Sequence, residues 1–143
     1  MRRRLRCLIL GLATLATPAW AELVVVANPK SGIDRLSRQD VVHLFMGRLR
    51  QLPSGIPAVP YDLPVESSDH AAFYRQLVNK DVSEIRAYWT RLVFSGGVRP
   101  PRAADGPAEL VRLIAADPGA IGYLDRSRVD ARLRIVYEFP ANP

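Results

Sequence analysis

The chain has 143 residues, a formal net charge of +6 and an isoelectric point near 10.1. Four of its 20 basic residues lie in the first six positions, so the chain from residue 22 onward carries 16 basic against 14 acidic side chains. Those charges alternate in sign and form no basic stripe, which argues against a nucleic-acid partner.

The first 21 residues, MRRRLRCLILGLATLATPAWA, predict a secretory signal peptide. Four arginines precede an apolar run from Leu8 to Ala16, and a small-x-small pattern ends at Ala21. The apolar run is about half of the ~20 residues that a membrane-spanning helix needs. We therefore expect cleavage after Ala21 and a periplasmic mature protein of one domain, residues 22–143.

Cysteine usage restricts the chemistry of that mature domain. Cys7 is the only cysteine of the chain and lies within the predicted signal peptide. Its removal leaves no thiol, which excludes disulfides, cysteine metal sites and thiol catalysis.

The mature chain begins with a predicted strand and a predicted helix. Residues 23–27, LVVVA, form a β-branched run typical of a buried strand. Ser37 and Asp40 have the spacing of a helix-capping box, and Gly47 supplies a stop. We expect a helix between these two signals.

A second strand and a second helix follow. Residues 56–61 form a strand candidate, but Pro57 and Pro60 cannot donate to a sheet ladder and so indicate an edge strand or a bend. The polar turn at residues 66–69 has the residues that start a helix, which we expect to run to about Asn79.

The most regular periodicity of the chain comes after Asp81. Apolar residues recur there at helical spacing until Gly96 and Gly97 end the pattern, at Ile85, Tyr88, Trp89, Leu92 and Val93. We interpret Trp89 as a packing residue. The proline-containing segment 98–105 is predicted to be an exposed connector.

The last elements complete an α/β pattern. Pro107 suits the first turn of a helix that runs to about Ala116, residues 117–119 form a turn, and strands are predicted over 120–124 and 133–139. Strands that alternate with helices predict an α/β sheet covered by helices.

Four segments, taken in order, resemble the phosphate-binding family of periplasmic solute-binding proteins of ABC transporters. They are SRQDVVHLFMGRL, AFYRQLV, AYWTRLVFSGG and DPGAIGYLD, and the resemblance covers about Leu23 to Asp125. It implies a three-layer αβα single lobe of the type II periplasmic binding protein-like fold. It also implies phosphate or another small oxyanion as ligand, and ABC transporter membrane subunits or another periplasmic protein as partner, with a homodimer as one way to supply a second lobe.

The segment that matches the family's pocket, DLPVESS, departs from the family pattern. Asp62 stands where the family has Arg, Glu66 replaces Ser, Ser67 replaces Gly, and Ser68 keeps a hydroxyl. The two added carboxylates repel an anion.

The candidate ligand-binding residues form two groups. Ser67, Ser68 and Asp69 open a helix whose N–H groups and dipole attract an anion, with Asp62 before them as a hydrogen-bond acceptor for a protonated ligand oxygen. The polar turn after the first strand adds Lys30, Ser31 and Gly32, which we expect at the sheet edge where α/β proteins bind ligands. Helix capping explains the serines without any ligand.

Nothing in the sequence favours an enzyme or a metal protein. His43 and His70 belong to no HExxH or HxH motif, and no GxSxG nucleophile elbow is present. Two functions stay open: a solute-binding domain for a small oxyanion, and a truncated interaction module that has lost ligand binding and contacts a periplasmic or membrane protein.

Overall fold

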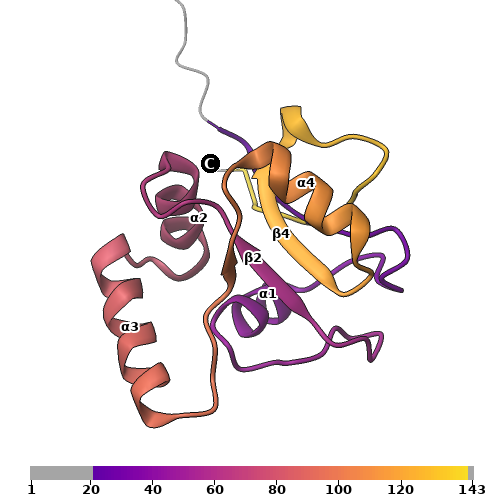
Figure 1. Cartoon of the computed structure of the whole chain (residues 1–143). Coiled ribbons are helices and arrows are strands. Elements are labelled where there is room, and N and C mark those ends of the chain that lie inside the picture. Colours follow the sequence, from indigo (N-terminus) through magenta and orange to yellow (C-terminus); the bar gives the residue numbers. More distant parts are fainter. Residues whose placement is uncertain (1–20, 142–143) are drawn as a thin grey trace, which may run out of the picture.

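A five-stranded mixed sheet in the order β3-β2-β4-β1-β5 organises the chain (Figure 1). The computed structural model describes residues 21–141. The strands are β1 (Leu23–Ala27), β2 (Val59–Asp62), β3 (Arg102–Ala103), β4 (Ala120–Asp125) and β5 (Arg134–Glu138). The helices are α1 (Arg38–Phe45), α2 (Ser68–Val78), α3 (Val82–Ser95), α4 (Pro107–Ala116) and the short 3-10 helix η1 (Arg126–Arg128).

Strand directions decide which loops share an edge of the sheet. Strand β2 runs parallel to both β3 and β4, whereas β1 runs antiparallel to β4 and β5. The carboxyl ends of β2 and β4 therefore lie at one edge. Strand β1 ends at the opposite edge, because Ala27 pairs with Ile121 near the start of β4.

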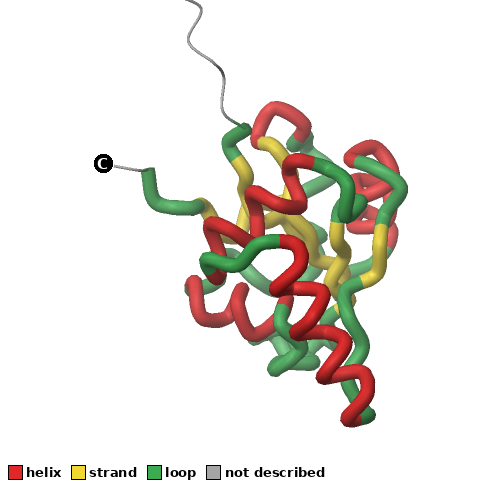
Figure 2. Tube along the Cα trace, turned by 90° about the vertical axis from the view of Figure 1, so that its left-hand side faces the viewer, coloured by secondary structure: helices red, strands yellow, loops and turns green. Residues whose placement is uncertain are grey.

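Helices cover both faces of this sheet, as neighbouring residues of β4 show (Figure 2). A Cβ on Gly122 would lie 3.0 Å from side chains of Leu110 and Ile114, so α4 packs on that face. The next side chain, Tyr123, points to the other face and contacts Phe73 of α2 and Phe45 of α1. The predicted αβα layering is confirmed.

Helix starts follow the local sequence signals. Ser37 and Asp40 form the predicted capping box at α1, and Asp81 with Glu84 forms another at α3. Helix α4 begins at Pro107, where a missing N–H costs no hydrogen bond. These signals depend on neighbouring residues alone, which is why the sequence predicts them well.

Two predictions about β2 and the connector are wrong. Strand β2 begins at Val59 and is internal rather than an edge strand, with β3 on one side and β4 on the other. Strand β3 lies within the segment 98–105 that we expected to be an exposed connector; both of its residues are exposed, but they form a strand. Pro60 is tolerated because β3 pairs only with Tyr61 and Asp62, the two residues that follow it. The missing N–H of Pro60 therefore removes no hydrogen bond between β2 and β3.

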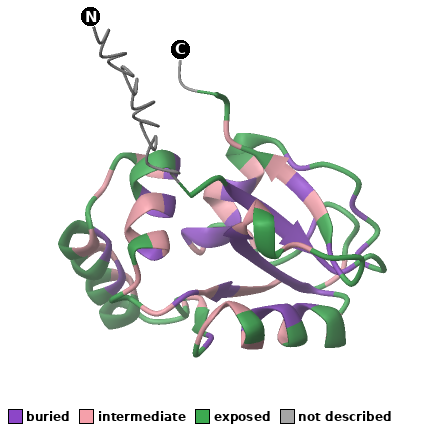
Figure 3. Cartoon of the chain, turned by 90° about the horizontal axis from the view of Figure 1, so that it is seen from above, coloured by how far each residue is buried: buried purple, intermediate pink, exposed green. Residues whose placement is uncertain are grey.

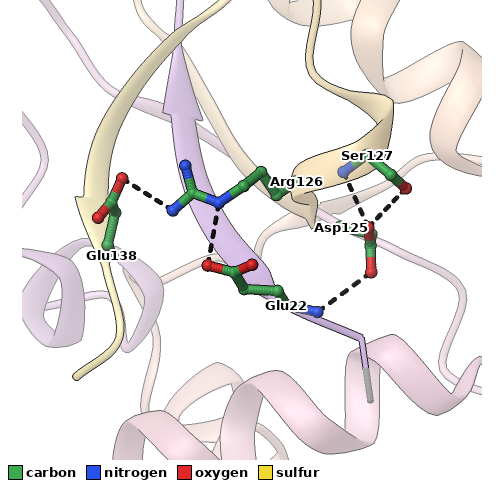
Figure 4. Close-up of polar contacts among 5 residues, drawn as sticks. All are labelled: Glu22, Asp125, Arg126, Ser127 and Glu138. Atoms are coloured by element: carbon green, nitrogen blue, oxygen red, sulfur yellow. Dashed lines mark hydrogen bonds and ion pairs between the residues drawn. The ribbon is translucent and has the colours of Figure 1, made fainter. Parts of the chain in front are cut away.

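An ion-pair network ties the start of β1 to its neighbours (Figure 4). The Arg126 guanidinium donates to Glu22 at 3.0 Å and to Glu138 at 2.8 Å. The backbone N–H of Glu22 donates to Asp125 at 3.2 Å, and Ser127 donates to the same carboxylate. These bonds, led by those from Ser127, hold the pKa of Asp125 below its usual value. The network fixes the chain at Glu22, the residue that precedes β1.

Helix α3 lies at the periphery of the domain (Figures 1 and 3). Trp89 is buried as predicted, and the Tyr88 hydroxyl donates to the Met46 carbonyl at 2.7 Å. At its C-terminal end Val93 is 52% exposed and Phe94 is 94% exposed. Within residues 21–141, no helix combines the length and apolarity of a membrane span. The predicted signal peptide lies outside the described residues, except for Ala21.

A substitution at Gly119 tests the close packing of the start of β4 against the segment before β2. A Cβ at this position would lie 2.1 Å from the Pro57 carbonyl oxygen. Because that contact is to backbone, Gly119→Ala should lower the free energy of unfolding by about 1–3 kcal/mol or prevent folding. Gly106→Ala is the matched control, since a Cβ there meets nothing within 4 Å. Urea unfolding measures both; equal stability of the two variants would contradict the packing.

Candidate functional site

The candidate site is built on Asp62, the last residue of β2. Its carboxylate Oδ1 accepts hydrogen bonds from the hydroxyls of Tyr74 at 2.8 Å and Tyr123 at 3.1 Å. The Asp62 side chain keeps 15% of its surface exposed. One carboxylate oxygen is thus fixed by two donors, while Oδ2 stays available.

The two tyrosines come from different elements and hold the carboxylate from two directions. Tyr74 lies on α2 and Tyr123 on the central strand β4, and both are buried. The Tyr123 hydroxyl also accepts from the backbone N–H of Leu63 at 3.2 Å, and its ring stacks on Phe73 with centroids 3.8 Å apart. Burial raises the pKa of both tyrosines, so they act as neutral hydrogen-bond donors.

Burial also changes the acidity of Asp62 and His70. It raises the pKa of Asp62 to about 6, although the two tyrosine hydrogen bonds act in the opposite direction. Burial lowers the pKa of His70, and the nearby Glu66 carboxylate offsets part of that change. At neutral pH His70 is therefore uncharged, and its 3.9 Å approach to Asp62 is no ion pair. Its Nδ1 is buried without a hydrogen-bond partner.

The first turn of α2 adds hydrogen-bond donors beside Asp62. Ser67 caps the helix, its Oγ accepting from the N–H of His70 at 3.1 Å. The N–H groups of Ser68 and Asp69 belong to the open first turn and bond to no described residue. This edge can donate to an oxyanion and accept from a ligand hydroxyl, while the carboxylates of Glu66 and Asp69 weaken its attraction for anions.

The loop after β1 does not join this site. We expected Lys30, Ser31 and Gly32 at the ligand edge; that placement is wrong, because β1 runs antiparallel to β4 and ends at the opposite edge. The loop serves the fold there: Ser31 is fully buried and its carbonyl accepts from Ser54 at 2.6 Å. Lys30 stays exposed.

Asn28 explains why this loop is polar without any ligand. Its side-chain amide donates to the carbonyls of Ile114 and Ala115 at 2.8 and 3.1 Å, and so completes the C-terminal turn of α4. Its Oδ1 accepts from the N–H of Lys30 at 2.8 Å. The polarity of the loop is thus structural.

Sequence reasoning missed the residues that surround Asp62, namely His70, Tyr74 and Tyr123. Tyr74 lies within the predicted helix that starts at residues 66–69, and Tyr123 within the predicted strand over 120–124. One signal was present for Tyr74: a buried tyrosine hydroxyl needs a hydrogen-bond partner, and Asp62 precedes it by 12 residues. Among residues 21–141, no three His, Cys, Asp or Glu side chains are grouped as a metal site.

The chain is a three-layer α/β domain with a polar cluster at the carboxyl ends of its parallel strands. Solved structures share this fold. An ABC-type phosphate transport receptor from Vibrio cholerae matches 85% of the chain with a TM-score of 0.66 at 13% identity. A putative phosphate ABC transporter substrate-binding protein from Clostridium perfringens, with bound phosphate, matches 80% with a TM-score of 0.64 at 17% identity.

PstS from Borrelia burgdorferi matches 85% of the chain with a TM-score of 0.62 at 13% identity. The chain covers 48%, 44% and 49% of these three proteins, about half the length of each. No protein-family model and no curated protein matches the sequence. The resemblance is therefore confirmed as a fold: the chain has the structure of a single lobe of phosphate substrate-binding proteins.

The raised pKa of Asp62 predicts how stability depends on pH. Because the folded-state pKa of about 6 exceeds the unfolded value of 3.8, the Asp62 contribution to stability is full below pH 4 and is lost as the pH rises through 6. The difference is about 3 kcal/mol. The Asp62→Asn variant has no carboxyl group to ionise at this position. Its free energy of unfolding, relative to that of wild type, should therefore increase between pH 4 and pH 8.

Urea unfolding at pH 4, 6 and 8 measures this change. Asp105→Asn, an exposed position, shows what the loss of any surface carboxylate does. His70 is present in all three proteins, so the comparison isolates Asp62. Parallel pH profiles for wild type and Asp62→Asn would show that Asp62 ionises as it does in water.

Proposed function

We propose that this chain is a periplasmic, non-enzymatic solute-binding domain for a small oxyanion such as phosphate, bound where Asp62 meets the first turn of α2. The observations that carry the proposal are the open N–H donors of Ser68 and Asp69 and the partly exposed Asp62 carboxylate, whose Oδ2 lies 3.9 Å from His70 in the same first turn of α2. The fold shared with phosphate substrate-binding proteins supports it.

The arrangement favours a protonated oxyanion. Hydrogen phosphate carries an O–H that can donate to Oδ2 of Asp62, while its other oxygens accept from the N–H groups of α2. Sulfate has no proton to donate at neutral pH, so the Asp62 carboxylate repels it. The same carboxylate therefore selects phosphate over sulfate.

The affinity of the isolated chain should be low. A helix terminus contributes at most about 2 kcal/mol to anion binding, and one charge-assisted hydrogen bond about 2 kcal/mol more. Together they correspond to a dissociation constant on the order of 1 mM, whereas micromolar affinity requires about 8 kcal/mol. A second lobe, from a second copy or another protein, would supply the remainder.

Isothermal titration of the chain from Glu22 onward, at low salt, tests the proposal. We expect saturable phosphate binding near millimolar concentration and weaker sulfate binding. Asp62→Asn should bring phosphate affinity down to the sulfate level, and Asp105→Asn should leave the preference intact. An unchanged preference for phosphate in Asp62→Asn would remove the proposed role of Asp62.

The same titration decides a second candidate function, an interaction module without ligand. The exposed Phe94 and Val93 at the end of α3 favour it, because large apolar side chains that cluster on a surface mark protein contacts. An interaction module without ligand predicts no saturable heat with phosphate or sulfate below tens of millimolar. One helix terminus alone contributes at most about 2 kcal/mol, which corresponds to a dissociation constant on the order of tens of millimolar.

A further inference from the structure

A groove of about 560 Å³ lies between the first turns of α4 and the segment that joins η1 to β5. Figure 1 shows this segment, in yellow, beside α4. The groove is lined by apolar and by charged residues. The apolar ones, which we call the floor, are Pro107, Ala108 and Val111, and the charged ones, which we call the rim, are Arg112, Arg128, Asp130 and Arg132.

The rim carries an excess of positive charge. Asp130 accepts hydrogen bonds from Arg132 at 2.8 and 3.2 Å, so the aspartate neutralises that arginine and holds it in place. Arg112 and Arg128 form no ion pair or side-chain hydrogen bond with any other residue of the described chain. Three arginines against one aspartate leave the rim with a net charge of +2.

Asp125, an acidic residue outside the groove, does not neutralise this excess. Asp125 lies close enough for Arg128 to help lower its pKa, after the larger effect of its hydrogen bonds from Ser127. That carboxylate already accepts from Ser127 and from the backbone N–H of Glu22. The Arg112 and Arg128 guanidinium groups therefore keep their donors for a ligand.

The groove is separate from the Asp62 site. Helix α4 packs on the face of β4 at Gly122, whereas Asp62 is held from the other face, by Tyr74 of α2. The sheet lies between them. Both open at the carboxyl end of β4, but the groove has cationic side chains, which the Asp62 site lacks among its described contacts.

We propose that this groove binds a phosphomonoester, with the phosphate dianion between Arg112 and Arg128 and the organic part on the apolar floor. Guanidinium groups match phosphate oxygens with paired hydrogen bonds, and a rim charge of +2 balances a dianion. The groove is larger than a lone phosphate ion needs, and its floor of Pro107, Ala108 and Val111 offers contact to carbon rather than oxygen. Phosphate is also the chemistry of a lipid headgroup, which the experiment separates from a soluble ligand.

Calorimetric titration of the chain from Glu22 onward with phenyl phosphate tests this inference. Phenyl phosphate should bind about tenfold more tightly than inorganic phosphate, the gain from burying roughly 50 Å² of apolar surface. The double variant Arg112→Gln/Arg128→Gln should lose at least about tenfold in phenyl phosphate affinity. Arg91→Gln, an exposed arginine of α3 outside the groove, should bind as wild type. Both groove positions are exposed, and circular dichroism confirms that the variants fold.

Two results would overturn the inference. If wild type and the double variant bind phenyl phosphate with equal affinity, Arg112 and Arg128 do not contact the ligand. If Asp62→Asn then lowers that affinity, the anion binds at the Asp62 edge instead. Binding to phosphatidylglycerol vesicles, but not to phosphatidylcholine vesicles or phenyl phosphate, with loss in the double variant, would assign the groove to a lipid headgroup. The proposed oxyanion site is judged separately, by the preference of wild type and Asp62→Asn for phosphate over sulfate.

Discussion

The close packing of β4 against β2 and α4 is the constraint on which the remaining structure depends. Two glycines make it possible, Gly119 beside the Pro57 carbonyl and Gly122 beneath Leu110 and Ile114. With β4 held there, Tyr123 reaches Asp62 and stacks on Phe73. The PGAIGY segment that carries the resemblance to phosphate-binding proteins thus has a packing explanation in this chain, independent of any ligand.

Most helices and strands could be predicted from the sequence because their signals are local. The capping box at Ser37 and the apolar periodicity after Asp81 depend on residues within a few positions of each other. Strand order depends on distant residues, so the internal position of β2 and the existence of β3 were missed. The candidate site was half predicted: Asp62 and the start of α2 lie together, but Lys30 lies at the other edge of the sheet because strand direction is not encoded locally.

The two candidate sites lie on opposite sides of the sheet. On the α2 side a buried aspartate with a raised pKa, held by two neutral tyrosines, faces an open helix terminus. On the α4 side three arginines line an open groove. As proposed, one site accepts a hydrogen bond from a ligand hydroxyl and the other supplies positive charge, so they suit ligands of different ionisation.

Amide-resolved NMR of the ¹⁵N-labelled domain, from Glu22 onward, tests the central claim most directly. With increasing inorganic phosphate, the account predicts saturable shifts of the Ser68 and Asp69 amide resonances, because those N–H groups donate to the anion. Sulfate at the same concentrations should move them less. Phosphate shifts confined to the loop at Lys30, or no saturable shift at the start of α2, would contradict the assignment of this edge as the oxyanion site.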